Sequence, residues 1–196
     1  MGGPTLHLAL DEQADALLSR DPLALLTGML LDQQVPMERA FAGPRTIADR
    51  LGTPDRLDAR TVADAEPQAF VALMTGPPAV HRFPGSMAGR VQALARTVVD
   101  DYGGDASAVW TTAPDGATLL RRLQTLPGFG EQKARIFVAL LGKQLGVQPT
   151  GWREAAGAYG EEGSRRSVAD VVDSRTLGEV RAYKQQVKAA RRAAGS

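Results

Sequence analysis

The chain has 196 residues, of which 43% are hydrophobic and 23% are charged, and its formal net charge is +1. These proportions are typical of a folded globular protein, and they exclude a wholly disordered or collagen-like chain. The absence of cysteine excludes disulfides, iron–sulfur clusters and thiolate zinc sites, and two histidines are too few for an imidazole-rich metal site. We therefore expect no metal site and no iron–sulfur cofactor.

The beginning of the chain, MGGPTLHLALDEQ, has neither the basic start nor the long apolar centre of a signal peptide. Elsewhere, no apolar run approaches the roughly 18 residues that span a bilayer. We therefore expect a cytoplasmic protein that has no membrane partner.

Helical patterns begin early in the chain. A first amphipathic helix is expected over 12–20, and Asp21-Pro22 then supplies an N-cap and a helix-compatible proline. The second helix is expected over 23–34 and ends in a pair of glutamines. A third is expected over 37–52, where Ala42-Gly43-Pro44 should bend or interrupt it.

The middle of the chain also predicts helices. The segment 61–76 gives shorter helices, and Gly76-Pro77-Pro78 marks a firm turn. Ser86 is expected to cap a helix over 87–104, whose apolar residues fall at helical spacing. Another helix is expected over 115–126.

The remaining segments lead to the fold class. Helices are expected over 131–146 and 175–194, and only Thr5–Leu10 hints at a strand. One strand cannot form a sheet. The predicted fold is therefore all-α, with short connections between many small helices.

Charge is distributed unevenly along the chain, although the net charge is close to zero. The segment 121–153 holds six basic residues against one acidic residue, and the segment 181–192 is also basic. Such asymmetry is typical of a protein with one anion-facing side. For the C-terminal basic helix the alternatives are simple solvation and contact with DNA.

The connection Leu126-Pro127-Gly128-Phe129-Gly130 joins two of the predicted helices. Its two glycines allow a sharp turn with positive φ and a close approach of a ligand to the backbone. The free N–H groups and the dipole of the following helix would complete an anion-binding site. This pattern predicts a helix-hairpin-helix, and a plain tight connection is the alternative.

At this point the sequence resembles the helix-hairpin-helix (HhH-GPD) DNA glycosylase superfamily of base excision repair, relatives of 3-methyladenine DNA glycosylase and endonuclease III. Three stretches carry the resemblance: LLTGMLLDQQVPMERAF, FPGSMAGRVQALARTVVDDYGG and LQTLPGFGEQKARIFVALLG. It implies one compact two-lobed helical unit over 1–196 with a cleft for a flipped-out nucleotide. Residues 36–115 would form one lobe, and 1–35 with 116–196 the other, including the helix-hairpin-helix over 116–142.

The resemblance also implies the partner and its contacts. The partner would be double-stranded DNA, bound by a monomer associated with the nucleoid. The residues expected to bind DNA belong to the hairpin and the following turn: Gly128, Phe129, Gly130, Gln132 and Lys133. A monovalent cation at the hairpin is the one bound ion that this resemblance allows.

Catalysis in the family uses an aspartate shortly beyond the hairpin's second helix, because cleavage of an N-glycosidic bond builds positive charge on the sugar. The resemblance puts this position at Thr150, which cannot carry a negative charge. Asp32 is the main candidate for a replacement carboxylate, since it lies where the family's early helix borders the cleft. The alternative is a local hydrogen-bonding or surface role. Glu154 is a weaker candidate.

Other residues near the predicted cleft have two interpretations each. Gln33 and Gln34 resemble the polar side chains that fill the gap left by a flipped base, or they are merely exposed. Trp152 either stacks on a base or belongs to the core.

The lyase branch of the family uses a lysine two residues after the last glycine of the hairpin. Gln132 occupies that position, and Lys133 is rotated by about 100° around the helix, so we expect Lys133 to miss the pocket. It would contact a phosphate or remain solvated. No lyase activity is therefore expected.

Three functions remain open. The chain could be a monofunctional DNA glycosylase that releases a damaged base, a catalytically silent protein that binds damaged or distorted DNA, or a helical protein-interaction module. The hairpin and the basic segments argue against the module. The retained family framework favours the enzyme, whereas the missing aspartate favours the silent binder.

Overall fold

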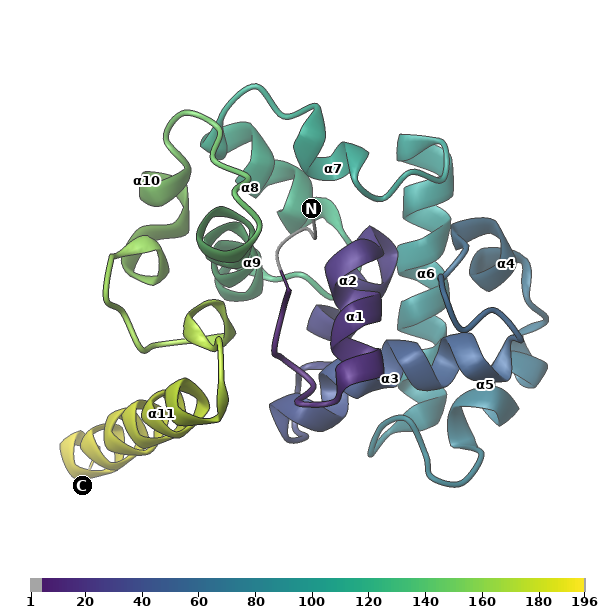
Figure 1. Ribbon diagram of the computed structural model, residues 1–196, viewed down its shortest axis with the longest axis horizontal. Helices are drawn as coiled ribbons and strands as arrows, with labels where there is room; N and C mark the ends of the chain where they lie inside the picture. Colours follow the sequence, from purple (N-terminus) through teal and green to yellow (C-terminus); the bar gives the residue numbers. More distant parts are fainter. Residues whose placement is uncertain (1–4, 196) are drawn as a thin grey trace.

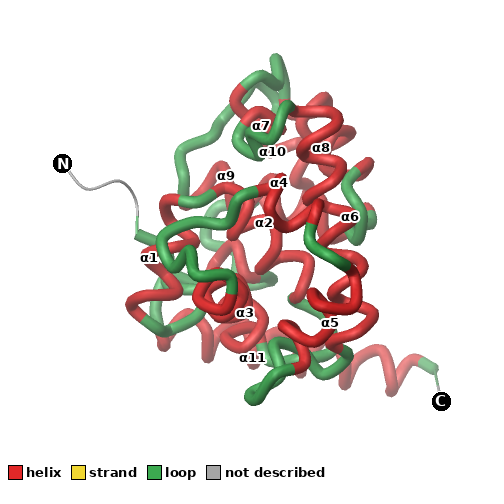
Figure 2. The backbone as a smooth tube through the Cα atoms, turned by 90° about the vertical axis from the view of Figure 1, so that its right-hand side faces the viewer, coloured by secondary structure: helices red, strands yellow, loops and turns green. Residues whose placement is uncertain are grey.

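A computed structural model describes residues 5–195. Met1–Pro4 and Ser196 lie outside the described residues. The first four residues of the N-terminal stretch that was compared with a signal peptide therefore lie outside them too. The described residues contain eleven α-helices and two 3-10 helices but no β-strand, which confirms the all-α class (Figures 1 and 2). The helices are α1 Glu12–Arg20, α2 Pro22–Leu31, α3 Met37–Arg50, α4 Ala59–Asp64, α5 Pro67–Thr75, α6 Pro84–Tyr102, α7 Ala108–Thr111, α8 Gly116–Thr125, α9 Glu131–Gln144, α10 Trp152–Ala156, η1 Gly157–Gly160, η2 Val168–Asp170 and α11 Ser174–Ala194.

Asp21 ends α1 and starts α2, as expected. Its N–H donates to the carbonyl of Leu17, and its carboxylate accepts from the N–H of Ala24 at 2.9 Å. The expected end of α2 at Gln34 is wrong, because the backbone leaves the helix at Asp32 (φ −73°, ψ 70°). The stretch after Leu31 is therefore a connecting loop.

Two other expectations about helices, an interruption of α3 and a cap at Ser86, are not confirmed. Helix α3 runs without interruption through Pro44, and Gly43 serves packing instead, since a Cβ there would lie 2.6 Å from Leu31 Cδ1. Helix α6 begins at Pro84, so Ser86 lies inside it and caps nothing. The strand hint at Thr5–Leu10 gives only irregular chain, whose Leu8 and Ala9 N–H groups donate to the Asp15 carboxylate.

The helices pack around one continuous apolar core. In Figure 1, α4, α5 and α6 lie together on one side, and α8, α9 and α10 lie on the other. Helix α2 packs on α3 and α6, while its C-terminal turn meets the connection between α8 and α9. It therefore lies between the two groups, and the boundaries of the expected lobes stay a prediction. None of the described helices is long and apolar enough to cross a membrane.

Trp152 belongs to the core, which decides between its two interpretations. It is 7% exposed and lies against Gly142 of α9, where an added Cβ would come within 2.4 Å of two ring carbons. We expect Gly142→Ala to lower the free energy of unfolding by about 1–3 kcal/mol, because the ring cannot move without disturbing the contact between α9 and α10. Urea denaturation measures this. The same change at Gly89, where nothing lies within 4 Å, should be neutral or stabilising.

Candidate functional site

The connection between α8 and α9 has the geometry that its glycines predict. Gly128 has φ 83°, and the N–H of Phe129 closes the turn on the carbonyl of Leu126 at 3.0 Å. Gly130 occupies the N-cap of α9 without a side-chain hydrogen bond to the first turn. The first N–H groups of α9 thus lack a side-chain cap, which is the arrangement that favours an anion.

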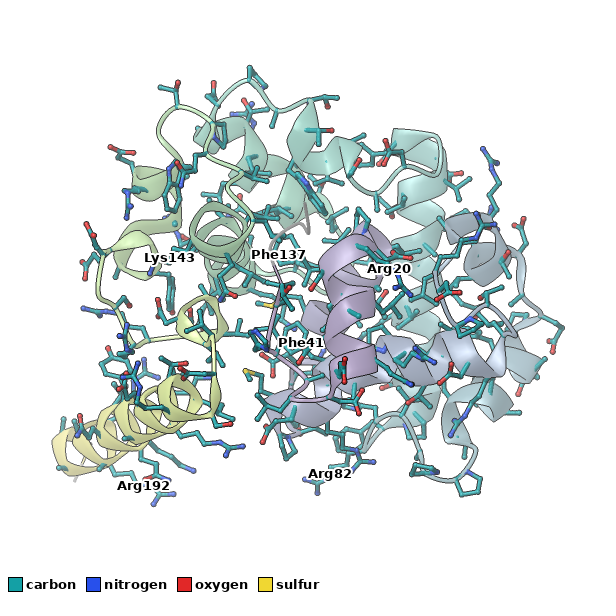
Figure 3. The ribbon with its side chains drawn as sticks, in the orientation of Figure 1. Arg20, Phe41, Arg82, Phe137, Lys143 and Arg192 are labelled. Atoms are coloured by element: carbon teal, nitrogen blue, oxygen red, sulfur yellow. The ribbon has the colours of Figure 1, made fainter. Side chains whose placement is uncertain are left out.

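Phe129 is one of the hairpin residues expected to bind DNA, and its side chain lies in the core. The ring is 3% exposed and packs edge-on against Phe137, with 5.8 Å between ring centroids. Phe137, labelled in Figure 3, points into the interior between α9 and α2. The Phe129 side chain therefore anchors the hairpin to the core and is unavailable to a ligand.

A cleft with a volume of about 900 Å³ lies beside the N-terminal end of α9. Its walls come from the end of α2 and the loop after it, from the first turns of α9, from η1 and from α11. Six of the lining residues are basic, namely Lys133, Arg166, Lys184, Lys188, Arg191 and Arg192, and Asp32 is their acidic neighbour. The cleft is therefore strongly cationic around one carboxylate.

Lys133 lines this cleft, so the expectation that it misses the pocket is wrong. Its Nζ donates to the carbonyls of Met29 at 2.7 Å and Leu30 at 3.1 Å, and lies 3.5 Å from that of Asp32. The ammonium group thus closes the C-terminal end of α2, where carbonyls lack intrahelical partners and the helix dipole favours a cation. Burial lowers the pKa of Lys133, and the carboxylate of Asp32 opposes this shift.

Removal of this ammonium group should be costly. We expect Lys133→Met to lower the free energy of unfolding by about 1–3 kcal/mol, because the carbonyls of Met29 and Leu30 lose their charged donor. They keep only weaker, uncharged donors, the N–H of Asp32 and the side-chain amide of Gln33. Equilibrium urea unfolding tests this. Gln132→Met, one residue earlier on an exposed position, is the matched control and should change stability by less than about 1 kcal/mol. Equal losses from both variants would contradict the capping role.

Asp32 is half-buried and lies at the start of the loop after α2. Burial raises the pKa of its carboxyl, the charges of Lys184 and Lys133 oppose this, and Glu38 adds to it. Among residues 5–195 no side chain or N–H group donates a hydrogen bond to this carboxylate. Its charge is therefore poorly solvated and remains available to a cation that enters the cleft.

Gln33 is held by the protein itself. Its amide nitrogen donates to the carbonyl of Leu30 at 2.9 Å, and its amide oxygen accepts from Arg90 at 3.2 Å. Its backbone carbonyl lies 2.9 Å from Nε2 of the buried His81, whose Nδ1 accepts from the N–H of Phe83. Since Nδ1 accepts, Nε2 carries the proton and donates to Gln33.

Gln34 differs from its neighbour. It is exposed, has φ 57°, and lines the cleft. Of the two glutamines, Gln34 is thus the one whose side chain is free to meet a ligand.

Gln132 also lines the cleft and donates to the hydroxyl of Tyr159 at 2.9 Å. Thr150, by contrast, does not line it. Its carbonyl accepts from the N–H of Gly116 at the start of α8, which is the end of the α8–α9 pair opposite the hairpin. Glu154 is exposed and outside the cleft. Thr150, where the resemblance places the catalytic aspartate of the family, is thus separated from the cleft.

One wall of the cleft has no signal in the sequence. Tyr159 and Arg166 reach it from the irregular region after α10, and Arg166 lies over the ring of Tyr183 at 5.6 Å. No periodic pattern marks that region. For α11 a signal did exist, since Lys184, Lys188 and Arg191 recur at helical spacing on one face.

No protein-family model matches the chain, and no curated protein does either. In the part of the chain that the structure describes, no group of three or more His, Asp and Glu side chains could hold a metal ion. The expectations about a cofactor and about a cation at the hairpin stay predictions. The geometry of the cleft and the helix-hairpin-helix motif are therefore the features that bear on function.

Proposed function

We propose that the protein binds double-stranded DNA and acts as a monofunctional DNA glycosylase, hydrolysing the N-glycosidic bond of a damaged base that has been flipped into the cleft. The observation that carries this proposal is the lone carboxylate of Asp32 inside a cationic cleft next to an uncapped α9 N-terminus. A monomer suffices, since one chain supplies every wall of the cleft.

Binding of DNA is supported by two kinds of group. The turn at Gly128 and Gly130 offers backbone N–H groups to one phosphate, as anion sites at helix N-termini do. The basic walls offer ammonium and guanidinium groups to further phosphates, which is the sequence-independent part of DNA affinity. Gln34 then lies where it could occupy the space that a flipped nucleotide leaves.

Base release needs negative charge near the sugar, because the transition state resembles an oxocarbenium ion. Asp32 has the required carboxylate and lies in a suitable environment. Burial raises the pKa of its carboxyl, so the ionised form is disfavoured in the free protein. A cationic centre in the cleft would stabilise that ionised form. Stabilisation would thus be greater in the transition state than in the ground state, which is the condition for catalysis.

Schiff-base chemistry is disfavoured by the contacts of Lys133. An amine nucleophile must lose a proton and turn its lone pair toward the sugar, but this nitrogen donates to carbonyls at the end of α2. We therefore expect no lyase activity.

The second candidate is a silent DNA-binding protein, and the position of Thr150 favours it, because the carboxylate of the related enzymes is missing there. One experiment separates the two functions. The purified protein is incubated with duplexes that each carry one alkylated, deaminated or oxidised base, and gel-shift binding and strand breaks are scored with and without alkali. Alkali-dependent breaks at one lesion support the glycosylase. Binding without any break supports the silent binder, and breaks without alkali refute the argument on Lys133.

A further inference from the structure

The C-terminal helix α11 is attached to the protein by its first half only. Thr176, Leu177 and Val180 are its buried residues, and Arg181 forms an ion pair with Glu38. Beyond that ion pair the helix is largely exposed and projects from the other helices at the lower left of Figure 1, where Figure 3 labels Arg192. Its second half therefore contributes little to the core.

The second half of α11 carries positive charges along one face of the helix. The segment 181–194 contains no acidic residue, and Lys184, Lys188 and Arg191 lie three or four residues apart, on one helical face. That face lines the cleft opposite Lys133. Within residues 5–195, Lys188 and Arg191 form no ion pair and no side-chain hydrogen bond, so their charges are not neutralised by the protein.

We propose that α11 is a second contact for the DNA backbone, facing the hairpin across the cleft, and that it binds consecutive phosphates of one strand. At about 1.5 Å per residue, the stripe from 184 to 191 is roughly 10 Å long, which is enough to reach two or three neighbouring phosphates of one strand. The hairpin and α11 would then hold the DNA from two sides. This inference rests on the proposed function for the identity of the partner.

The chemistry of the helix favours a phosphate backbone over a lipid surface. A membrane-binding helix needs large apolar side chains on the face opposite its charges. In the segment 181–194, Tyr183 and Val187 are the large apolar residues, and both line the cleft. The remaining uncharged positions are alanine and glutamine.

The test compares two double variants that each remove two exposed positive charges. Lys188→Ala with Arg191→Ala changes α11, and Arg56→Ala with Arg60→Ala changes the region at α4, on the opposite side of the molecule in Figure 1. The affinity of each full-length protein for an undamaged duplex is measured at several salt concentrations. We expect the slope of log K against log salt to become shallower by about 2 for the α11 variant, and to stay unchanged for the control.

Equal slopes for the two variants and the wild type would overturn the role of α11, while leaving the hairpin and the cleft in place. Circular dichroism checks that both variants are folded, and Lys188→Glu with Arg191→Glu should weaken binding further. Base release is scored separately on lesion-containing duplexes. A shallower slope for the α11 variant alone, together with no base release by the wild type, would refute the glycosylase and support α11. A wild type that binds no DNA would refute both.

Discussion

Asp32→Asn is expected to reduce the rate of base release by about 10²–10³-fold, because the amide keeps the shape of the side chain but cannot carry the charge that opposes an oxocarbenium-like centre. DNA affinity should be unchanged or slightly higher, since one anion leaves a cationic cleft. The measurement is the single-turnover rate on the lesion that the wild type releases.

Glu154→Gln is the matched control for this loss of a carboxylate. Glu154 is exposed and does not line the cleft, so its removal should leave the rate within a factor of two or so of the wild type. A wild-type rate for Asp32→Asn, or an equal loss in the two variants, would remove Asp32 from the mechanism.

The raised pKa of Asp32 gives this prediction a pH dependence. The carboxylate form is required, so the rate should fall as the pH drops through a pKa that lies above the ordinary 3.8. The pH dependence of folding stability has the opposite sign to that of the rate. A raised pKa in the folded state means that stability is lost as the pH rises from the ordinary value through the raised one. Asp32→Asn should therefore stabilise the protein at neutral pH.

Phe129→Ala is expected to lower the free energy of unfolding by about 3–5 kcal/mol, the usual cost of emptying a buried aromatic site. Phe129 is 3% exposed, and its edge-on contact with Phe137 is lost as well. Because this ring holds the hairpin on the core, DNA affinity should also fall at temperatures where the variant is still folded. Urea unfolding measures the loss of stability, and gel-shift titration measures the loss of DNA affinity.

Phe83→Ala serves as the control for Phe129→Ala. Phe83 is 42% exposed, and its ring lies 6.2 Å from that of His81, so less than about 1 kcal/mol should be lost. If Phe129→Ala were as mild as the control, the ring could not be the anchor of the hairpin.

The sequence predicted those parts of the fold that local signals determine. Asp21 marked the boundary between α1 and α2, and the glycines around Phe129 marked the turn between α8 and α9. The errors arose where packing overrides such signals. Pro44 did not break α3, and the backbone left α2 three residues before the expected end.

The site was predicted only in part. Asp32 and Gln34 both line the cleft, near a helix end that the sequence marks, and their expected roles stay predictions. The expected position of Lys133 was wrong, since the rotation around α9 was judged without knowing that the end of α2 lies against that face. The wall made by α11 depends on contacts between segments far apart in the chain, such as Arg181 with Glu38, which no local pattern reveals.

The central claim is that a flipped base enters the cleft between α2, α9 and α11. Its most direct test is photo-crosslinking with a duplex that carries a photoreactive base at the position of the lesion, followed by mass-spectrometric identification of the modified residue. The account predicts crosslinks to residues that line the cleft, with Gln34, Tyr159 and Tyr183 the main acceptors. Crosslinks confined to residues outside the cleft, such as those around Thr150, would contradict it.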